Sequence, residues 1–279
     1  RSGHWGLHCG SPRWAAVRCG GAQPCPPAVP EGVLSQGLLV MIVAASALGA
    51  GVKGVTGMGY PLLAVPLISL VGGVDDAVVA VAAPNLAANA YLCWHARAGR
   101  HETRDMGRLV GWGIGGAVVG TVALVSLPDD PLLVVLAVTI VWFVVQFLRH
   151  PELRMPADTA RRWSPVAGTI TGLMQGAVGV SGPVVATWLH PYRLPRETYV
   201  YSITLLFGVT GAVQLAVLLG QGEMTTTRAW ASLAAAIPAA ITLPLGVRLR
   251  QRLAGDTFDR VVLAVLLVSA LSLLVQVVA

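Results

Sequence analysis

Long apolar runs, separated by short polar loops, are the feature that most limits how this chain can fold. A helix of about 20 residues crosses the hydrocarbon core of a bilayer. Backbone polar groups have no water partners at that depth, so each run must form a helix or a protein-buried break between two helices. We therefore predict an all-α, polytopic integral membrane protein. Long runs occupy 34–51, 77–96, 107–127, 132–148, 198–219, 229–247 and 260–279, and shorter runs occupy 61–71, 165–178 and 183–190.

Charged residues are scarce, and their distribution indicates an orientation in the membrane. They make up 11% of the chain, whereas about a quarter of the residues in a typical soluble domain are charged. Arginines concentrate in three loops, at 97–108, 149–164 and 248–260, which predicts that these loops are cytoplasmic. The net charge of +6 therefore reflects membrane topology, and we expect no nucleic-acid partner.

The chain also carries an internal repeat. The residues Gly54, Gly57 and Pro61 recur 122 residues later as Gly176, Gly179 and Pro183. Because the arginine-rich loops alternate with acidic ones, the second copy takes the opposite orientation to the first. We predict two inverted-topology repeats, each with a Gly/Pro-broken helix pair followed by three membrane helices. Such repeats, with broken helices at matching positions, are typical of secondary transporters.

The predicted domains follow from this repeat. The first transmembrane repeat covers 34–148, a cytoplasmic linker covers 149–164, and the second repeat covers 165–279. Residues 1–33 contain no continuous apolar stretch and are expected to be a disordered or mis-called N-terminal tail. Their cysteines, Cys9, Cys19 and Cys25, lack the spacing of a metal site. No metal and no cofactor is expected.

The two glycine-rich breaks suggest an anion site. Each break presents free backbone N–H groups at the start of a helix, which attract anions. Lys53 is the one charged residue clearly inside an apolar span; it either pairs with an anion or snorkels to a surface. All thirteen acidic residues fall in the tail, in loops or at span edges, which favours an anionic substrate over a carboxylate relay. The predicted substrate-binding residues are Lys53, Gly54, Thr56, Gly57, Gly59, Asn85, Asn89, Gln175, Gly176, Gly179, Ser181 and Gly182.

Close helix packing is the other reading of glycines in membrane helices. It also explains single polar residues, through hydrogen bonds between helices. For the helix predicted at 107–127 we favour packing, by Gly111, Gly115, Gly116 and Gly120.

The segments Gly54–Pro61 and Gly179–Pro183, with Val65-Pro66-Leu67 after the first, resemble the sulfite exporter TauE/SafE family of bacterial permeases. The resemblance covers roughly residues 34 to 279. It implies export or uptake of sulfite, sulfonates or related organosulfur anions, with both glycine motifs near the substrate. Many members carry Gly-Gly-Gly where this chain has Gly59-Tyr60-Pro61, so Tyr60 is expected to narrow or reshape that part of the site.

We therefore predict a multi-pass permease of the cell membrane, the bacterial inner membrane, whose partners are a small anion and the lipid bilayer. It would work by alternating access and not as an enzyme; both a monomer and a homo-oligomer stay open. A passive anion channel is the alternative. An intramembrane serine protease is a remote one, because Ser181 in Gly179-Val180-Ser181-Gly182 would need a histidine base and no apolar run after residue 190 contains one.

Overall fold

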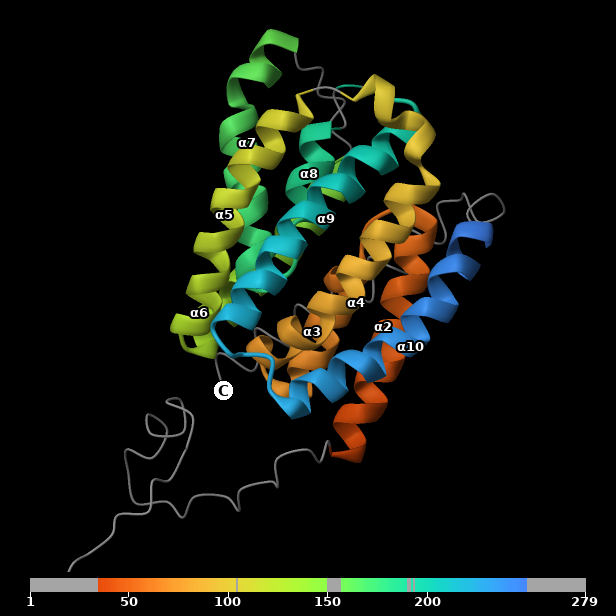
Figure 1. Ribbon diagram of the computed structural model, residues 1–279. Coiled ribbons are helices and arrows are strands. Elements are labelled where there is room, and N and C mark those ends of the chain that lie inside the picture. The colour runs from red at the N-terminus through yellow and green to blue at the C-terminus, as the bar shows by residue number, and fades with distance from the viewer. Residues whose placement is uncertain (1–34, 104, 150–156, 190–191, 193, 250–279) are drawn as a thin grey trace, which may run out of the picture. The chain divides into compact units, whose positions relative to one another are not determined.

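The computed structural model describes residues 35–103, 105–149, 157–189, 192 and 194–249. All of them belong to one compact unit of the chain, residues 34–279, while the tail 1–33 forms another unit and lies outside the described residues. The predicted last run, 260–279, also lies outside them. The described elements are α2 (Gln36–Thr56), α3 (Tyr60–Gly72), α4 (Val74–His95), the 3-10 helix η1 (Arg97–Glu102), α5 (Met106–Ser126), α6 (Asp129–Arg149), α7 (Ala157–Val178), α8 (Gly182–Leu189), α9 (Arg196–Gly220) and α10 (Thr226–Leu249) (Figure 1).

Five of these helices are long and apolar enough to cross a membrane: α2, α4, α5, α9 and α10. Large apolar side chains on their outer faces are exposed, among them Val40 on α2, Val119 on α5 and Ile237 on α10. Such a surface would be unfavourable in water and fits contact with lipid. The described part of the chain contains helices and no strands, so the prediction of an all-helical membrane protein is confirmed at that level.

The predicted helices of 107–127 and 198–219 agree closely with α5 and α9, but two other boundaries differ. Helix α2 continues past the predicted end at Gly51 to Thr56. Helix α7 begins at Ala157, inside the segment that was expected to be a linker. The helix breaks themselves are shorter than the glycine-rich sequences, and they span only 57–59 and 179–181.

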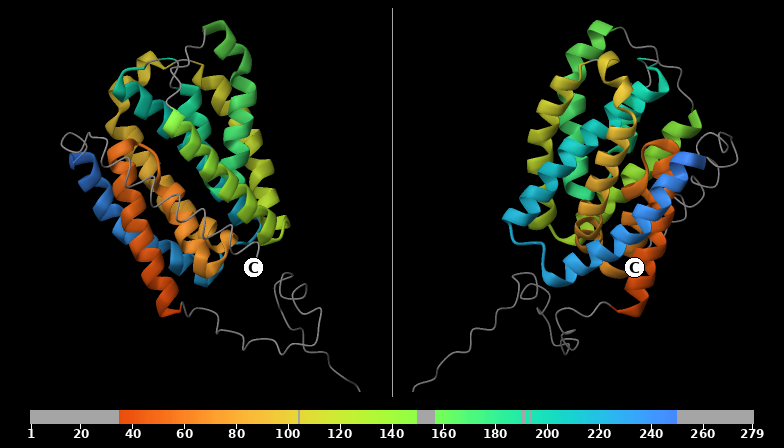
Figure 2. Two further views of the ribbon diagram at one scale, coloured as in Figure 1. Left: turned by 180° about the vertical axis from the view of Figure 1, so that it is seen from behind. Right: turned by 45° about the vertical axis from the view of Figure 1, so that its right-hand side comes forward.

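The helices of the two sequence halves are interleaved (Figures 1 and 2). Helix α10, from the second half, packs on α2 and α4 of the first half. Helix α5, from the first half, packs in the same way on α7 and α9 of the second half. Helices α4 and α9 pack on each other and so join these two groups. Each half of the sequence therefore contributes one helix, α5 or α10, that packs on helices of the other half.

Glycines allow close helix crossings in two places, between α2 and α10 and between α7 and α5. A Cβ on Gly54 of α2 would lie 2.9 Å from both the Cα of Gly246 and the backbone nitrogen of Val247 on α10. A Cβ on Gly176 of α7 would lie 2.9 Å from the carbonyl carbon of Gly120 on α5 and 2.6 Å from the backbone nitrogen of the next residue. Gly54 and Gly176 are the pair related by the repeat, so equivalent positions make equivalent contacts.

The packing prediction for α5 is right for two of its four glycines. Gly116 and Gly120 lie against the backbone of α7, at residues 169–177. Gly111 and Gly115 have no atom of the described residues within 4 Å of the position a Cβ would take, so the prediction is wrong for them in that part of the chain. A helix has only one face toward a given neighbour, and Gly111 and Gly115 lie on another face of α5.

Candidate functional site

The first helix break is a tight turn built on two left-handed glycines. Gly57 has φ 87° and ends α2 by donating its N–H to the carbonyl of Lys53 at 2.7 Å, and Gly59 has φ 110°. Residues with a Cβ adopt this conformation at a cost of roughly 1–2 kcal/mol. The hydroxyl of Thr56 accepts a hydrogen bond from the N–H of Met58 at 3.2 Å and stabilises the turn. Helix α3 then begins at Tyr60.

The second break repeats this layout. Helix α7 ends at Val178, and Gly179, with φ 71°, donates its N–H to the carbonyl of Gln175 at 3.0 Å. Gln214 of α9 donates its side-chain N–H groups to the carbonyls of Gln175, at 2.8 Å, and Gly176, at 3.1 Å. The last carbonyls of a helix lack partners within it, so Gln214 satisfies the carbonyl of Gly176 and gives the carbonyl of Gln175 a second donor.

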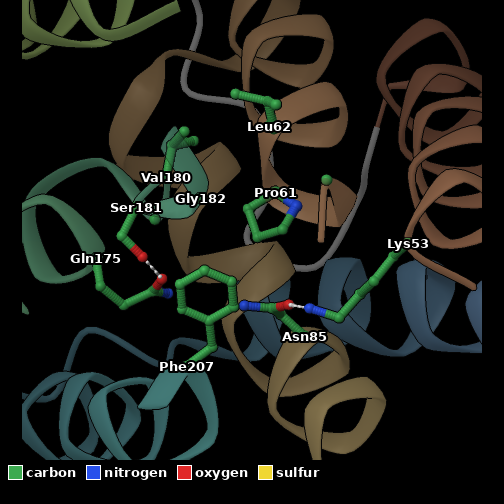
Figure 3. A pocket seen from close by; sticks show the side chains of 11 residues that line it. Lys53, Pro61, Leu62, Asn85, Gln175, Val180, Ser181, Gly182 and Phe207 are labelled. Atoms are coloured by element: carbon green, nitrogen blue, oxygen red, sulfur yellow. Dashed lines mark hydrogen bonds between the residues drawn. The ribbon is translucent and has the colours of Figure 1, made fainter. Parts of the chain in front are cut away.

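A small cavity lies where the two breaks meet (Figure 3). Its volume is about 10 Å³, measured as the space open to the centre of a water molecule. That is room for roughly one water. The lining comes from both breaks and from α2, α3, α4, α7, α8 and α9: Lys53, Gly59, Pro61, Leu62, Asn85, Gln175, Gly179, Val180, Ser181, Gly182 and Phe207.

Lys53 brings a positive charge to the cavity. Its side chain is completely buried, which contradicts the alternative that it snorkels to a surface. Its ammonium donates a hydrogen bond to the Oδ1 atom of Asn85 at 3.1 Å and lies 5.7 Å from the ring centroid of Phe207. Among the side chains whose burial the structure describes, no other charged one is completely buried. A buried ammonium with only a neutral partner is costly, which is typical of a functional group.

Gln175 and Ser181 form a second polar pair, which faces Lys53 and Asn85 across the cavity (Figure 3). The Ser181 hydroxyl donates to Oε1 of Gln175 at 2.8 Å, and both side chains are buried. The Nε2 atom of Gln175 has no hydrogen-bond partner among the described residues. Buried polar atoms without partners are rare, so this donor is available to a ligand in the cavity.

The two sides of the cavity correspond through the repeat offset. A shift of 122 residues places Lys53 on Gln175 and Asn85 on Phe207. The same shift places Gly59 on Ser181, which lies in the second break. The cavity therefore lies between equivalent segments of the two halves, although the side chains on its two sides differ.

Most of the predicted site residues line this cavity, namely Lys53, Gly59, Asn85, Gln175, Gly179, Ser181 and Gly182. The others lie outside the lining. Gly54 and Gly176 lie at the helix crossings, and Thr56 and Gly57 form the first turn. Asn89 is buried one turn along α4 from Asn85, and both polar atoms of its amide lack a partner among the described residues.

Phe207 and Leu62 line the cavity and were not anticipated from the sequence, and neither was a lining role for Pro61 and Val180. Apolar residues in an apolar span carry no signal of their own. The repeat offset was the signal that would have found Phe207, because it pairs this residue with Asn85.

A second polar cluster ties α10 to α4 outside the cavity. The Arg228 guanidinium donates to Asp75 at 2.8 Å and to Asp76 at 2.7 Å, both in the first turn of α4. It also contacts the carboxylate of Glu223, just before α10. Arg228 is largely buried, with a side-chain exposure of 13%. Because α4 and α10 belong to different halves, this cluster links the two halves.

No curated protein and no solved structure matches the chain. A family model described as Sulfite exporter TauE/SafE matches residues 41–273. That range contains both helix breaks and the whole lining of the cavity. The resemblance expected from the two glycine motifs is confirmed: the chain belongs to the sulfite exporter TauE/SafE family.

Proposed function

We propose that this protein is a secondary transporter that carries a small sulfur oxyanion, such as sulfite or a sulfonate, through the cavity between its two helix breaks. The family supports membrane transport of sulfite-type anions in general. The observation that carries the choice of an oxyanion is Lys53, a fully buried ammonium in a cavity where no described lining residue is a carboxylate.

Several donors converge on the cavity. The ammonium of Lys53 and the unpartnered Nε2 atom of Gln175 come from α2 and α7. The N-termini of α3 and α8 also meet it, through Pro61 and Leu62 on one side and Gly182 on the other. The N–H groups at such N-termini carry partial positive charge. Together these groups would replace the water molecules that solvate an oxyanion.

The equivalent helix crossings support two repeats of inverted topology. Gly54 packs on α10 as Gly176 packs on α5, and α10 and α5 occupy matching places in the two halves. In Figure 1, α2 begins at the lower end of the bundle and α7 at the upper end. In alternating access, the two halves exchange conformations around a fixed site, which opens it to one side and then to the other.

The size of the cavity favours a transport cycle over a passive channel. A space for about one water cannot hold a sulfite ion, so binding requires the surrounding helices to move. The hydrogen bonds between Lys53 and Asn85 and between Ser181 and Gln175 would open to release their donors to the anion. Flux limited by such a rearrangement saturates with substrate concentration. A dependence on an ion gradient, and not on voltage alone, would then identify coupled transport.

The same contacts argue against a serine protease. A nucleophilic serine needs a base that accepts its proton, and the Ser181 hydroxyl donates instead to the amide oxygen of Gln175. We therefore treat Ser181 as a ligand-binding residue and not as a nucleophile.

Uptake of labelled sulfite into proteoliposomes tests the proposal. Lys53→Gln should lower the rate at least about tenfold, because a buried anion loses its charged partner. Val40→Ala, an exposed change on the same helix, is the matched control and should keep the wild-type rate. Normal saturable uptake by a correctly folded Lys53→Gln variant would refute the assignment of the cavity as the substrate site.

A further inference from the structure

We propose that the cavity selects sulfur oxyanions with a single negative charge and rejects dianions of the same shape. The inference rests on the proposed function, since it concerns the ligand of that same cavity. It follows from the charge of the lining, which comes from one side of the cavity only.

The side chains that line the cavity carry one positive charge in total. Among the described residues that line the cavity, Lys53 is the only charged one, and the other polar side chains there, Asn85, Gln175 and Ser181, are neutral. A monoanion would bring the site to neutrality. A dianion would leave one buried negative charge without a partner, which is strongly unfavourable away from water.

The internal repeat sharpens this argument, because a second cation could have occupied the matching position. The residue 122 positions after Lys53 is Gln175, which lines the facing side of the cavity. It presents an amide whose Nε2 atom is buried and lacks a partner among the described residues. Gln175 therefore provides a hydrogen-bond donor where a symmetric site would provide a second charge.

The apolar part of the lining specifies the rest of the ligand. Phe207 takes the place that corresponds to Asn85, and Leu62 and Val180 add further apolar surface. Oxygens of the ligand would contact Lys53 and Gln175, while an uncharged substituent on sulfur would contact the apolar side. The ligand class is thus an SO₃ group with one negative charge and a small fourth substituent, as in hydrogen sulfite or methanesulfonate.

Competition with ions of fixed charge tests this selectivity. Methanesulfonate is a monoanion and sulfate a dianion throughout the neutral pH range, and both are tetrahedral at sulfur. Each is titrated against uptake of labelled sulfite in proteoliposomes, and the two inhibition constants are compared. We expect methanesulfonate to inhibit at a concentration at least about tenfold lower than sulfate. Equal inhibition, or stronger inhibition by sulfate, overturns the inference.

Two variants change the number or the place of the cations without changing the apolar lining. Gln175→Lys adds a second cation and should shift the ratio of inhibition constants at least about tenfold toward sulfate. The double exchange Lys53→Gln with Gln175→Lys keeps one cation on the opposite side and should retain the monoanion preference. A folded Gln175→Lys variant with the wild-type ratio contradicts the inference, and the wild-type ratio decides the matter if that variant does not fold.

These results separate the two proposals. Absence of any saturable sulfite uptake by the folded wild-type protein would refute the proposed function. Saturable uptake with a preference for dianions would leave that function standing and refute the charge selectivity alone.

Discussion

Two adjacent glycines in α5 allow the close α5–α7 crossing to be tested against an internal control. Gly116 lies against α7, where a Cβ would meet the backbone nitrogen of Leu173 at 2.8 Å. A Cβ on Gly115 would have no atom of the described residues within 4 Å. Replacing a glycine inside a helix by alanine gains about 1 kcal/mol from backbone conformation alone. Gly115→Ala should therefore stabilise the protein slightly.

Gly116→Ala gains the same conformational term but adds a clash with backbone atoms, which cannot rotate away. Overpacking of this kind costs roughly 1–3 kcal/mol. The difference between the two alanine variants cancels the conformational term and should equal that cost. Denaturant titration of the purified variants in detergent micelles measures this difference, and the free energy of unfolding should be lower for Gly116→Ala than for Gly115→Ala.

The crossing also positions the cavity, so transport should follow stability. Gly172 and Gly176, on either side of Gln175 along α7, both lie against the backbone of α5. A clash at Gly116 would push α7 outward and displace Gln175, lowering sulfite uptake more than Gly115→Ala does. Equal stability of the two alanine variants would refute the crossing as we describe it.

Three further changes probe the parts around the cavity. Gln214→Leu removes the side-chain donor of the Gly176 carbonyl and one of the two donors of the Gln175 carbonyl, so it should lower the free energy of unfolding by about 1–3 kcal/mol. An unchanged value in denaturant titration would contradict the contact. Gly179→Ala places a Cβ at ordinary contact distances. In the same titration it should lower the free energy of unfolding only by the cost of a left-handed backbone, roughly 1–2 kcal/mol. A much larger loss would mean that the break has no space for the Cβ. Arg228→Gln leaves three carboxylates without their common cation. It should lower the midpoint of thermal unfolding in detergent by several degrees, and by less at high salt. An unchanged midpoint would show that the link between the halves adds no stability.

The helices could be predicted from the sequence because their main determinant is local. A run of apolar residues has only one way to satisfy its backbone in a bilayer, so α5 and α9 agree closely with the predicted segments. The true end of α2 was less accessible. Gly51 and Gly54 looked like a helix break, but both contact α10, and only the three-dimensional packing of that later helix reveals it.

The candidate site was predicted in part for the same reason. Lys53, Asn85 and Gln175 are polar residues inside apolar spans, and their cost in a membrane makes them visible in the sequence. Phe207 carries no such cost and was missed. The role of Gly176 was also hidden, because a glycine at a helix crossing and a glycine at a ligand look alike in one dimension.

The repeat explains how the fold provides a site that is symmetric in backbone and asymmetric in chemistry. Matching glycines, Gly57 and Gly179, end the two broken helices α2 and α7. At matching positions, α2 packs closely on α10 and α7 packs closely on α5. The alternating access that we propose needs this equivalence, since each half must then adopt the conformation of the other. Recognition of one anion has no such requirement. The ammonium can therefore reside on one half alone, at Lys53, and the other half can present the neutral amide of Gln175 without disturbing the exchange.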